Sequence, residues 1–244
     1  PSVLTLIGVC LGITSIKFAM DGNFGFAVLF VIVAAILDGL DGRVARMIKG
    51  TSDFGKELDS LTDFVSFGIA PAFIIYFWEL INYGKIGWII TLIYSICCVL
   101  RLARFNLTKT SIEEEWKQNY FEGVPSPVGA ILILIPLIYN LAELDLNFSL
   151  ISITPYLTLI VSILLISKLP TFSFKKIKIK PAITVFILLT TVISLVSLIF
   201  FTYLTLLVFG VVYLLTIPFS IFFYLKNKKN MRTLSKEDDH EDVL

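Results

Sequence analysis

Histidine is almost absent from this chain, and charged residues are scarce for its length. Only 1 of the 244 residues is histidine, and 16% are Asp, Glu, Lys or Arg, whereas soluble domains carry about a quarter. The single His240 lies in the C-terminal run KEDDHEDVL, whose composition is typical of a disordered tail. A histidine-dependent catalytic triad and a phosphohistidine intermediate are therefore nearly excluded.

Cysteine is also rare. The three cysteines, Cys10, Cys97 and Cys98, all lie inside apolar runs of the sequence. Their spacing matches neither a disulfide framework nor a zinc site, so we expect them to pack as small hydrophobic side chains.

Apolar residues are abundant instead, and they form long runs. The chain is 57% hydrophobic with a mean hydropathy of +0.88, and a helix of about 20 apolar residues is long enough to cross a bilayer. The sequence predicts an all-α, polytopic membrane protein with about eight transmembrane helices and no separate soluble domain. The predicted spans are residues 3–20, 23–42, 58–80, 86–104, 125–142, 148–167, 182–202 and 204–225.

Two of these spans carry a residue that is unusual within a membrane helix. Lys17 lies in the first span, and Pro155 interrupts the sixth. The gap at residues 202–204 is so short that the last two spans are expected to form a tight helical hairpin.

The positions of Lys and Arg predict the orientation of the chain. All of the 20 basic residues except Lys17 and Lys85 fall on one side of the eight predicted spans. Because basic loops are retained on the cytoplasmic side, we expect this basic face and both termini to be cytoplasmic. Such a face also attracts anionic lipids and nucleotides.

Four aspartates are regularly spaced at the facing ends of the second and third spans. At about 100° per residue, each helix presents two carboxylates on a face of otherwise mostly small residues. Gly50 is suited to end the first helix, and Thr51 or Ser52 to cap the next, so the two helices are predicted to be antiparallel neighbours. The first face comprises Asp38, Asp41, Gly42, Ala45 and Arg46, and the second comprises Gly55, Asp59, Asp63, Ser66 and Ala70.

Converging carboxylates indicate a site for cations. Such carboxylates either take up protons or hold positive ions among them, and oxygen ligands favour Mg²⁺, Mn²⁺ or Ca²⁺. Gly42 and Gly55 allow a nucleotide diphosphate to approach the backbone, and Arg46 is able to bind its phosphate oxygens. Helix capping, helix packing and an ion pathway are the alternative interpretations of these residues.

The spacing D-x2-D-G-x2-A-R-x8-G-x3-D-x3-D from Asp38 to Asp63 resembles the signature of the CDP-alcohol phosphatidyltransferase family, and every fixed position is matched. The segment LDGLDGRVARMIKGTSDFGKELDSLTDFVSFGIAPA resembles the phosphatidylserine synthase branch of that family, as do the stretches RLARFN and FEGVPSPVGA. Together these stretches extend the resemblance over roughly residues 1–145.

The resemblance implies two divalent ions, Mg²⁺ or Mn²⁺, and a bound CDP group. The metal ligands would be Asp38, Asp41, Asp59 and Asp63, with Asp63 also acting as the general base. The positions matching the CDP contacts of the family are Gly42, Ala45, Arg46 and Gly55, to which we add Thr51 and Ser52 on the connecting loop.

The family architecture is a six-helix core around a cytoplasm-facing polar cavity, often in a homodimer. Applied to this chain, residues 1–202 would hold the core and the start of the C-terminal hairpin, and residues 203–225 the final transmembrane helix. Residues 226–244 would be a charged cytoplasmic tail, expected to be disordered.

The implied reaction is transfer of a phosphatidyl group from CDP-diacylglycerol to the hydroxyl of L-serine, with release of CMP by direct displacement. The enzyme would be a multi-pass membrane protein whose active site faces the cytoplasm, with no nucleic-acid partner. Two alternatives stay open: a sister enzyme that uses glycerol 3-phosphate or inositol phosphate, and a non-enzymatic ion pathway or lipid-binding protein. The candidate serine-binding residues are Arg101, Arg104, Asn106 and Ser126, although both arginines also suit simple anchoring at the cytoplasmic boundary.

Overall fold

A computed structural model describes residues 2–47, 53–108, 120–143, 150–167, 169–172 and 181–220 of the chain. These residues are predominantly helical. The helices are α1 (Ser2–Met20), α2 (Phe24–Met47), α3 (Asp53–Asp63), the π-helical segment η1 (Phe64–Ile69), α4 (Ala70–Trp78), α5 (Gly84–Thr108), α6 (Ser126–Leu141), α7 (Thr154–Ile166) and α8 (Pro181–Phe200). A last helix covers Thr202–Ser220, and two 3-10 turns, η2 (Leu80–Tyr83) and η4 (Ile151–Ile153), precede α5 and α7.

Each of the eight predicted spans coincides with a helix. Five helices in the described part of the chain are long and apolar enough to cross a membrane: Val3–Met20, Phe24–Val44, Phe54–Trp78, Leu80–Asn106 and Thr202–Ser220. Shorter apolar helices cover Ser126–Leu141, Ile151–Ile166 and Leu188–Phe200. The protein is thus a helical, multi-pass integral membrane protein, and the full count of eight spans stays a prediction.

Both residues that were unusual for a membrane helix lie at helix ends. Lys17 occupies the last turn of α1 and forms an ion pair with Asp21, one helical turn further along. The prediction that Pro155 interrupts the sixth span is wrong, because Pro155 lies in the first turn of α7. Proline is favoured there, since its missing N–H has no partner within the helix.

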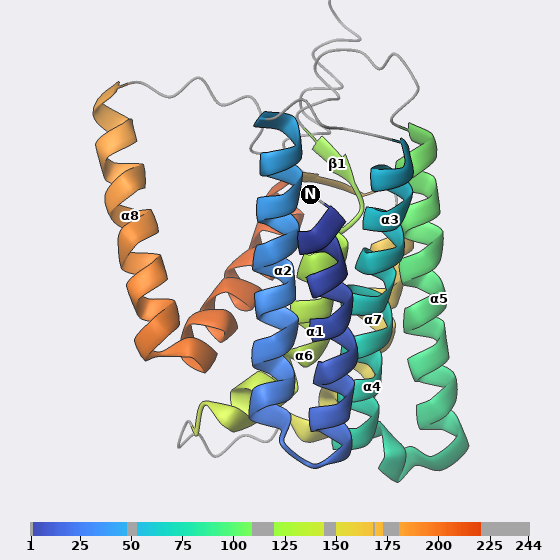
Figure 1. The fold of residues 1–244 in the computed structure, drawn as a ribbon. Coiled ribbons are helices and arrows are strands. Elements are labelled where there is room, and N and C mark those ends of the chain that lie inside the picture. The colour runs from blue at the N-terminus through green and yellow to red at the C-terminus, as the bar shows by residue number, and fades with distance from the viewer. Residues whose placement is uncertain are drawn as a thin grey trace, which may run out of the picture.

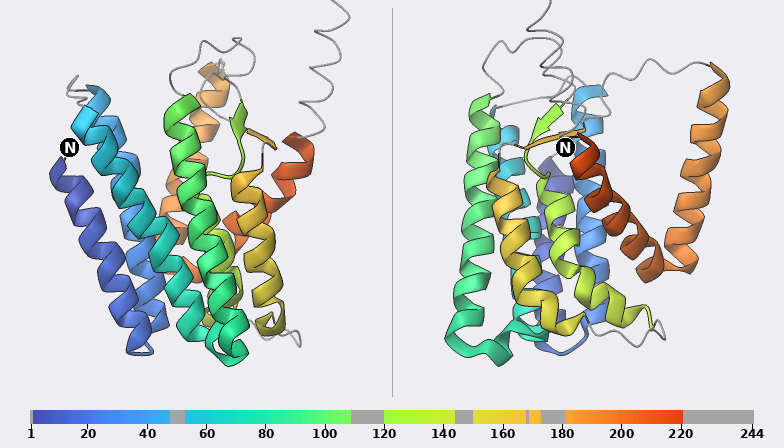
Figure 2. Two further views of the ribbon diagram at one scale, coloured as in Figure 1. Left: turned by 90° about the vertical axis from the view of Figure 1, so that its right-hand side faces the viewer. Right: turned by 180° about the vertical axis from the view of Figure 1, so that it is seen from behind.

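The helices run alternately up and down, so that sequence-distant segments meet at one end of the bundle. The N-terminus of α1, the C-termini of α2, α5 and α7, and the starts of α3 and α6 all lie at the upper end in Figure 1 and Figure 2. Two short strands, β1 (Tyr120–Glu122) and β2 (Pro170–Phe172), pair antiparallel at the same end. The buried core below them comes mainly from α2, α4, α5 and α6.

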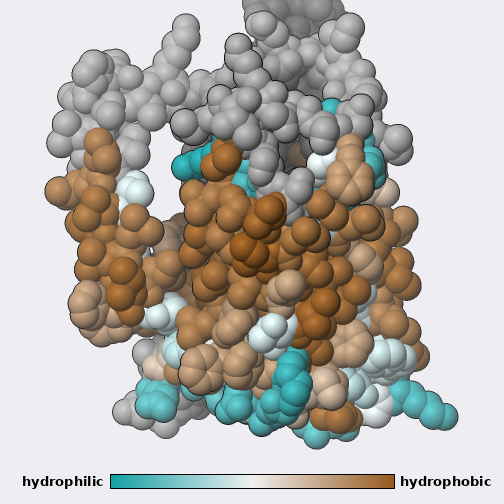
Figure 3. Space-filling model, viewed as in Figure 1, coloured by the Kyte–Doolittle hydropathy of each residue, from teal (hydrophilic) through white to brown (hydrophobic). Residues whose placement is uncertain are grey.

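The last two helices form a hairpin beside the bundle. As predicted, their connection is short, because α8 ends at Phe200 and the next helix begins at Thr202. The side chains of Ser197 and Thr205 are hydrogen-bonded at 2.6 Å across this turn. In Figure 1 and Figure 2 α8 leans away from the other helices, and in Figure 3 its surface is largely hydrophobic, like the sides of the bundle.

Candidate active site

The acidic motif forms one cluster where α2 and α3 run antiparallel, as the sequence predicted. Asp38 extends from α2, and Asp59 and Asp63 from α3. Each of these three residues offers a carboxylate oxygen, and the three oxygens lie within 4.8 Å of one another. Like charges at this spacing repel strongly when they are partly shielded from water, so the cluster must either take up protons or hold positive charge.

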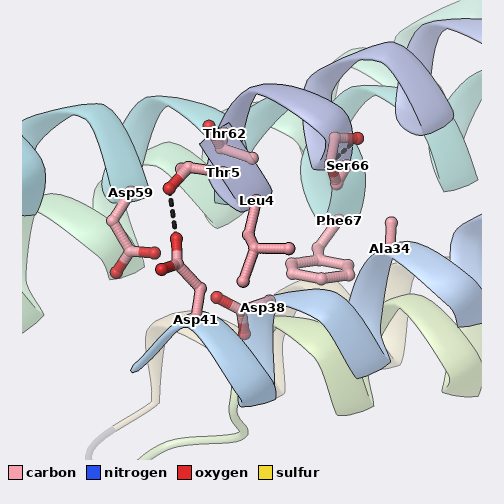
Figure 4. A pocket seen from close by; sticks show the side chains of 10 residues that line it. Leu4, Thr5, Ala34, Asp38, Asp41, Asp59, Thr62, Ser66 and Phe67 are labelled. Atoms are coloured by element: carbon pink, nitrogen blue, oxygen red, sulfur yellow. Dashed lines mark hydrogen bonds between the residues drawn. The ribbon is translucent and has the colours of Figure 1, made fainter. Parts of the chain in front are cut away.

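Asp41 lies beside this trio and has a partner on a third helix. Its side chain is 5% exposed, and one of its oxygens, Oδ2, accepts a hydrogen bond from the Thr5 hydroxyl of α1. Asp41 and Asp59 extend from their helices toward the same pocket, which Asp38 also lines (Figure 4). The pocket is therefore enclosed by α1, α2 and α3 together.

Small residues bring α1 close to the acidic motif. A Cβ atom at Gly8 would meet Thr62 at 3.2 Å, and one at Gly12 would meet the Ser66 backbone at 3.1 Å. The Ser66 hydroxyl also donates a 3.1 Å hydrogen bond to the Gly8 carbonyl. Such small-residue contacts are the usual means of close helix packing in membranes, and here they place Thr5 next to Asp41.

The residues present fit a hard divalent cation. The donors are all carboxylate oxygens, which Mg²⁺, Mn²⁺ and Ca²⁺ prefer. The Oδ1 atoms of Asp41 and Asp63 are buried without a hydrogen-bond partner, and a buried carboxylate oxygen without a partner is unfavourable. The trio of Asp38, Asp59 and Asp63 and the neighbouring Asp41 would hold such ions.

The structure describes some of the residues predicted to hold a CDP group, and these lie on α2 and α3. Gly42 follows Asp41 on α2, and a Cβ atom at this position would meet nothing within 4 Å, so its backbone is open to a ligand. The backbones of Ala45 and Arg46 continue α2, and Gly55 lies in α3. The predicted caps Gly50, Thr51 and Ser52 lie outside the described residues.

Arg101 of α5 bonds to the start of α6. Its guanidinium donates a hydrogen bond to the hydroxyl of Ser126 at the start of α6, and its positive charge acts on the Asp63 carboxylate. Its Nε is buried and has no hydrogen-bond partner. The structure thus brings two of the four candidate acceptor residues, Arg101 and Ser126, into contact with each other.

The other two candidates have structural contacts instead. Arg104 donates hydrogen bonds to the backbone oxygens of Ile166 and Ser167, at 2.6 and 3.1 Å, and so binds the C-terminal end of α7. Asn106 donates a 2.9 Å hydrogen bond to the Ser60 hydroxyl, which ties α5 to α3.

One contact of the cluster and one irregularity of the helix after it were not predicted from the sequence. Thr5 was overlooked, although Thr5, Gly8, Gly12 and Ser15 form a stripe of small residues with helical spacing in an apolar run. The regular spacing assumed as far as Ser66 and Ala70 is wrong, because residues 64–69 form a π-helix rather than an α-helix.

A helical membrane protein with a carboxylate cluster at one end, an arginine opposite it and an open helix backbone beside it is suited to binding metal and phosphate. The chain belongs to the CDP-alcohol phosphatidyltransferase family, whose model matches residues 1–164.

Several curated relatives of this chain share one more specific enzyme name within the family. The chain is 36% identical over 227 residues to the CDP-diacylglycerol–serine O-phosphatidyltransferase of Mycobacterium leprae, covering 91% of this chain and 74% of that protein. It is 35% identical over 187 residues to the enzyme of the same name from Helicobacter pylori strain 26695, covering 73% of each. The Bacillus subtilis enzyme of that name is 37% identical over 141 residues, covering 57% of this chain and 76% of that protein.

Proposed function

We propose that this protein transfers the phosphatidyl group of CDP-diacylglycerol to the hydroxyl of L-serine, producing phosphatidylserine and CMP. The observation that carries the proposal is the meeting of three motif carboxylates within 4.8 Å of one another. The names of the relatives from three bacterial genera support serine as the acceptor.

The proposed reaction is a single displacement at phosphorus. The serine oxygen forms a bond to the phosphorus that carries diacylglycerol, and the bond from that phosphorus to the CMP oxygen breaks. Asp63 takes the proton of the attacking hydroxyl, as a general base within reach of the substrate does. Two divalent ions, Mg²⁺ or Mn²⁺, would neutralise negative charge on the phosphates when bound, and Asp38, Asp41, Asp59 and Asp63 would be their ligands.

The donor nucleotide is proposed to lie along α2. The open backbone at Gly42 gives the diphosphate access to the helix, and the family motif adds Ala45, Arg46 and Gly55, with Thr51 and Ser52 on the connection. The acceptor is proposed to lie on the side of α5 and α6, where Arg101 and Ser126 meet. Its carboxylate would bind the Arg101 guanidinium, which suits planar bidentate recognition.

We further propose that eight helices span the membrane, that six of them form the catalytic core, and that the active site and both termini face the cytoplasm. The acidic cluster lies toward the end of the bundle where Arg43, Lys56, Arg101 and Arg104 also lie, as the preference for cytoplasmic basic residues requires. Residues 1–202 would form the core with the start of the hairpin, 203–225 the final helix and 226–244 a tail. A homodimer is the assembly that the family resemblance implies.

The first experiment is CMP release by the purified protein from CDP-diacylglycerol with L-serine, glycerol 3-phosphate, inositol phosphate or no acceptor, with and without Mg²⁺ or Mn²⁺. Release that needs both serine and a metal is the expected result. Release only with a phosphorylated alcohol would keep the displacement but reject serine as the acceptor. No release with any acceptor would reject the enzyme and favour a non-enzymatic membrane protein.

A further inference from the structure

A π-helical turn begins directly after the proposed base. Asp63 is the last residue of α3, and η1 covers Phe64–Ile69 before α4 starts at Ala70. The Ala70 N–H bonds to the carbonyl of Val65, five residues back rather than four. Turns of this kind are rare, occur mostly as single-turn bulges within α-helices and are frequent at functional sites.

Pro71 supplies the cause. In a regular α-helix the carbonyl of Phe67 would accept a hydrogen bond from the N–H of residue 71, but proline has no N–H and its ring clashes with that carbonyl. Pro71 lies in the first turn of α4, within the continuous apolar span Phe54–Trp78. Because no water is available in the membrane interior, a carbonyl freed in this way needs a donor from a neighbouring helix.

Tyr94 of α5 is that donor. Its side chain is 0% exposed, and its hydroxyl donates a 2.9 Å hydrogen bond to the Phe67 carbonyl. The hydroxyl of Ser95 bonds more weakly, at 3.4 Å, to the next carbonyl, that of Gly68. Helix α5 thus replaces the hydrogen bond that Pro71 removes.

The opposite side of the same turn is held by α1. Ser66, the third residue of η1, donates its hydroxyl to the Gly8 carbonyl at 3.1 Å. Helix α5 packs just as tightly on its own side, since a Cβ atom at Gly68 would meet the Cys98 sulfur at 3.2 Å. The π-turn is therefore held between two helices.

The turn determines where Asp59 and Asp63 point. One inserted residue rotates the helix before it by about 100° relative to the helix after it. Helix α4 is fixed by its fully buried residues Ala72, Ile74 and Ile75, so relaxation of η1 to an α-helix would turn α3 instead. The carboxylates of α3 would then rotate away from Asp38 on α2.

We propose that Tyr94 is a positioning residue, which holds the Pro71-induced π-turn in place and thereby keeps Asp59 and Asp63 directed at Asp38. The inference rests on the proposed roles of these aspartates in metal binding and catalysis. Tyr94 itself does not touch substrate in this account, and its effect passes through the Phe67 carbonyl.

The test is a double-mutant cycle between Tyr94→Phe and Pro71→Ala. Alanine at position 71 restores an N–H for the Phe67 carbonyl, so the tyrosine hydroxyl is no longer needed there. Because η1 can then relax toward an α-helix, Pro71→Ala is itself expected to lower kcat and Mn²⁺ affinity, and the cycle compares the additional effect of Tyr94→Phe in each background. With Pro71 present, we expect Tyr94→Phe to lower kcat and Mn²⁺ affinity by roughly tenfold, which is the lower end of the effect of removing a direct partner of a metal ligand, because Tyr94 acts only through the backbone of η1. In the Pro71→Ala background, the same change should alter both quantities by less than about twofold.

Mn²⁺ affinity is measured by calorimetry on the purified protein without substrates, so this readout stays informative even if serine proves not to be the acceptor. Tyr76→Phe is the matched control, because Tyr76 lies in the last turn of α4, at the end of that helix remote from η1, and its ring packs against Trp88. The proposal would be overturned if Tyr94→Phe lowered kcat and Mn²⁺ affinity by the same factor in the wild-type protein and in the Pro71→Ala variant. So would a variant that lowers Tm but leaves Mn²⁺ affinity and kcat unchanged.

Discussion

Arg101 on α5 donates a hydrogen bond to the hydroxyl of Ser126 at the start of α6. Burial of a guanidinium against a neutral hydroxyl is costly unless further acceptors are present. The Nε of Arg101 is buried with no such acceptor. A carboxylate on the incoming substrate would supply it, whereas Arg104 already bonds to the end of α7.

This difference predicts that Arg101→Gln reduces recognition of the acceptor carboxylate, while Arg104→Gln does not. Loss of a charge-assisted hydrogen bond corresponds to about 10- to 100-fold in affinity. We expect the KM for L-serine to rise by that factor in Arg101→Gln, with the KM for CDP-diacylglycerol within about threefold. The preference for L-serine over L-serinamide, which lacks the carboxylate, should decrease in the same variant.

Arg104→Gln is the matched control, three residues away on the same helix. Its lost contacts to Ile166 and Ser167 should lower stability without changing the preference for serine over serinamide. An unchanged KM for serine in Arg101→Gln would remove Arg101 from the acceptor site. Arg101→Lys, which keeps the charge but not the planar fork, should give an intermediate KM.

A second prediction separates the two aspartates of α3. Asp63→Asn removes the proposed base, and because general-base catalysis contributes roughly 10²–10⁴-fold, most turnover should be lost while CDP-lipid binding is largely retained. Asp59→Asn removes a metal ligand only, so activity should recover in part at higher Mg²⁺ or Mn²⁺ concentration. Turnover and CDP-lipid binding are measured for both.

The control for this pair is Asp21→Asn at the opposite end of α1, where the carboxylate only pairs with Lys17. If Asp63→Asn lost turnover and CDP-lipid binding in equal proportion, its assignment as a base would be wrong. The assignment would also be wrong if added metal restored the turnover of Asp63→Asn as far as it restores that of Asp59→Asn.

Regular helical spacing accounts for the part of the site that the sequence predicted. Asp38 and Asp41 lie on α2, Asp59 and Asp63 lie on α3, and the 3.6-residue period holds throughout both. The spans, too, follow from apolar runs whose length is set by the bilayer. Both inferences use only local information along the chain.

Contacts between distant helices were not predictable in the same way. The pairing of Thr5 with Asp41 depends on how closely α1 approaches α2. The helical period changes after Asp63, because Pro71 has no N–H to bond to the carbonyl of Phe67, four residues earlier. The two arginines three residues apart looked equivalent in sequence, yet one bonds to Ser126 of α6 and the other binds the end of α7. Only the packing of α5 between its neighbours distinguishes them.

Thr5 provides a third prediction. Thr5→Val keeps the shape of the side chain but removes the hydrogen bond to Asp41. Since partners of metal ligands typically contribute about 10- to 100-fold to affinity or activity, we expect the metal concentration for half-maximal activity to rise within that range. Metal titrations of activity and of Mn²⁺ binding measure it.

Two further variants control this experiment. Thr5→Ser retains the hydroxyl and should restore most of the metal affinity. Thr14→Val changes a threonine of the same helix whose hydroxyl bonds only to the Cys10 carbonyl, at 2.6 Å, away from the cluster. A Thr5→Val protein with wild-type metal affinity would show that Asp41 needs no such partner.

The last prediction concerns the closeness of α1 to the acidic motif. Any Cβ atom at Gly12 would lie 3.0 Å from the Ser66 hydroxyl oxygen and 3.1 Å from its Cα, so Gly12→Leu must push α1 away from η1. Overpacking of this kind costs about 1–3 kcal/mol, and the shift would also withdraw Thr5 from Asp41. Activity should therefore fall together with Mn²⁺ affinity, and Tm should drop.

Ile13→Phe adds similar bulk at the neighbouring position, which is 56% exposed, and should leave all three quantities near the wild-type values. If Gly12→Leu lowered Tm alone, α1 would contribute to the stability of the bundle but not to the arrangement of the site.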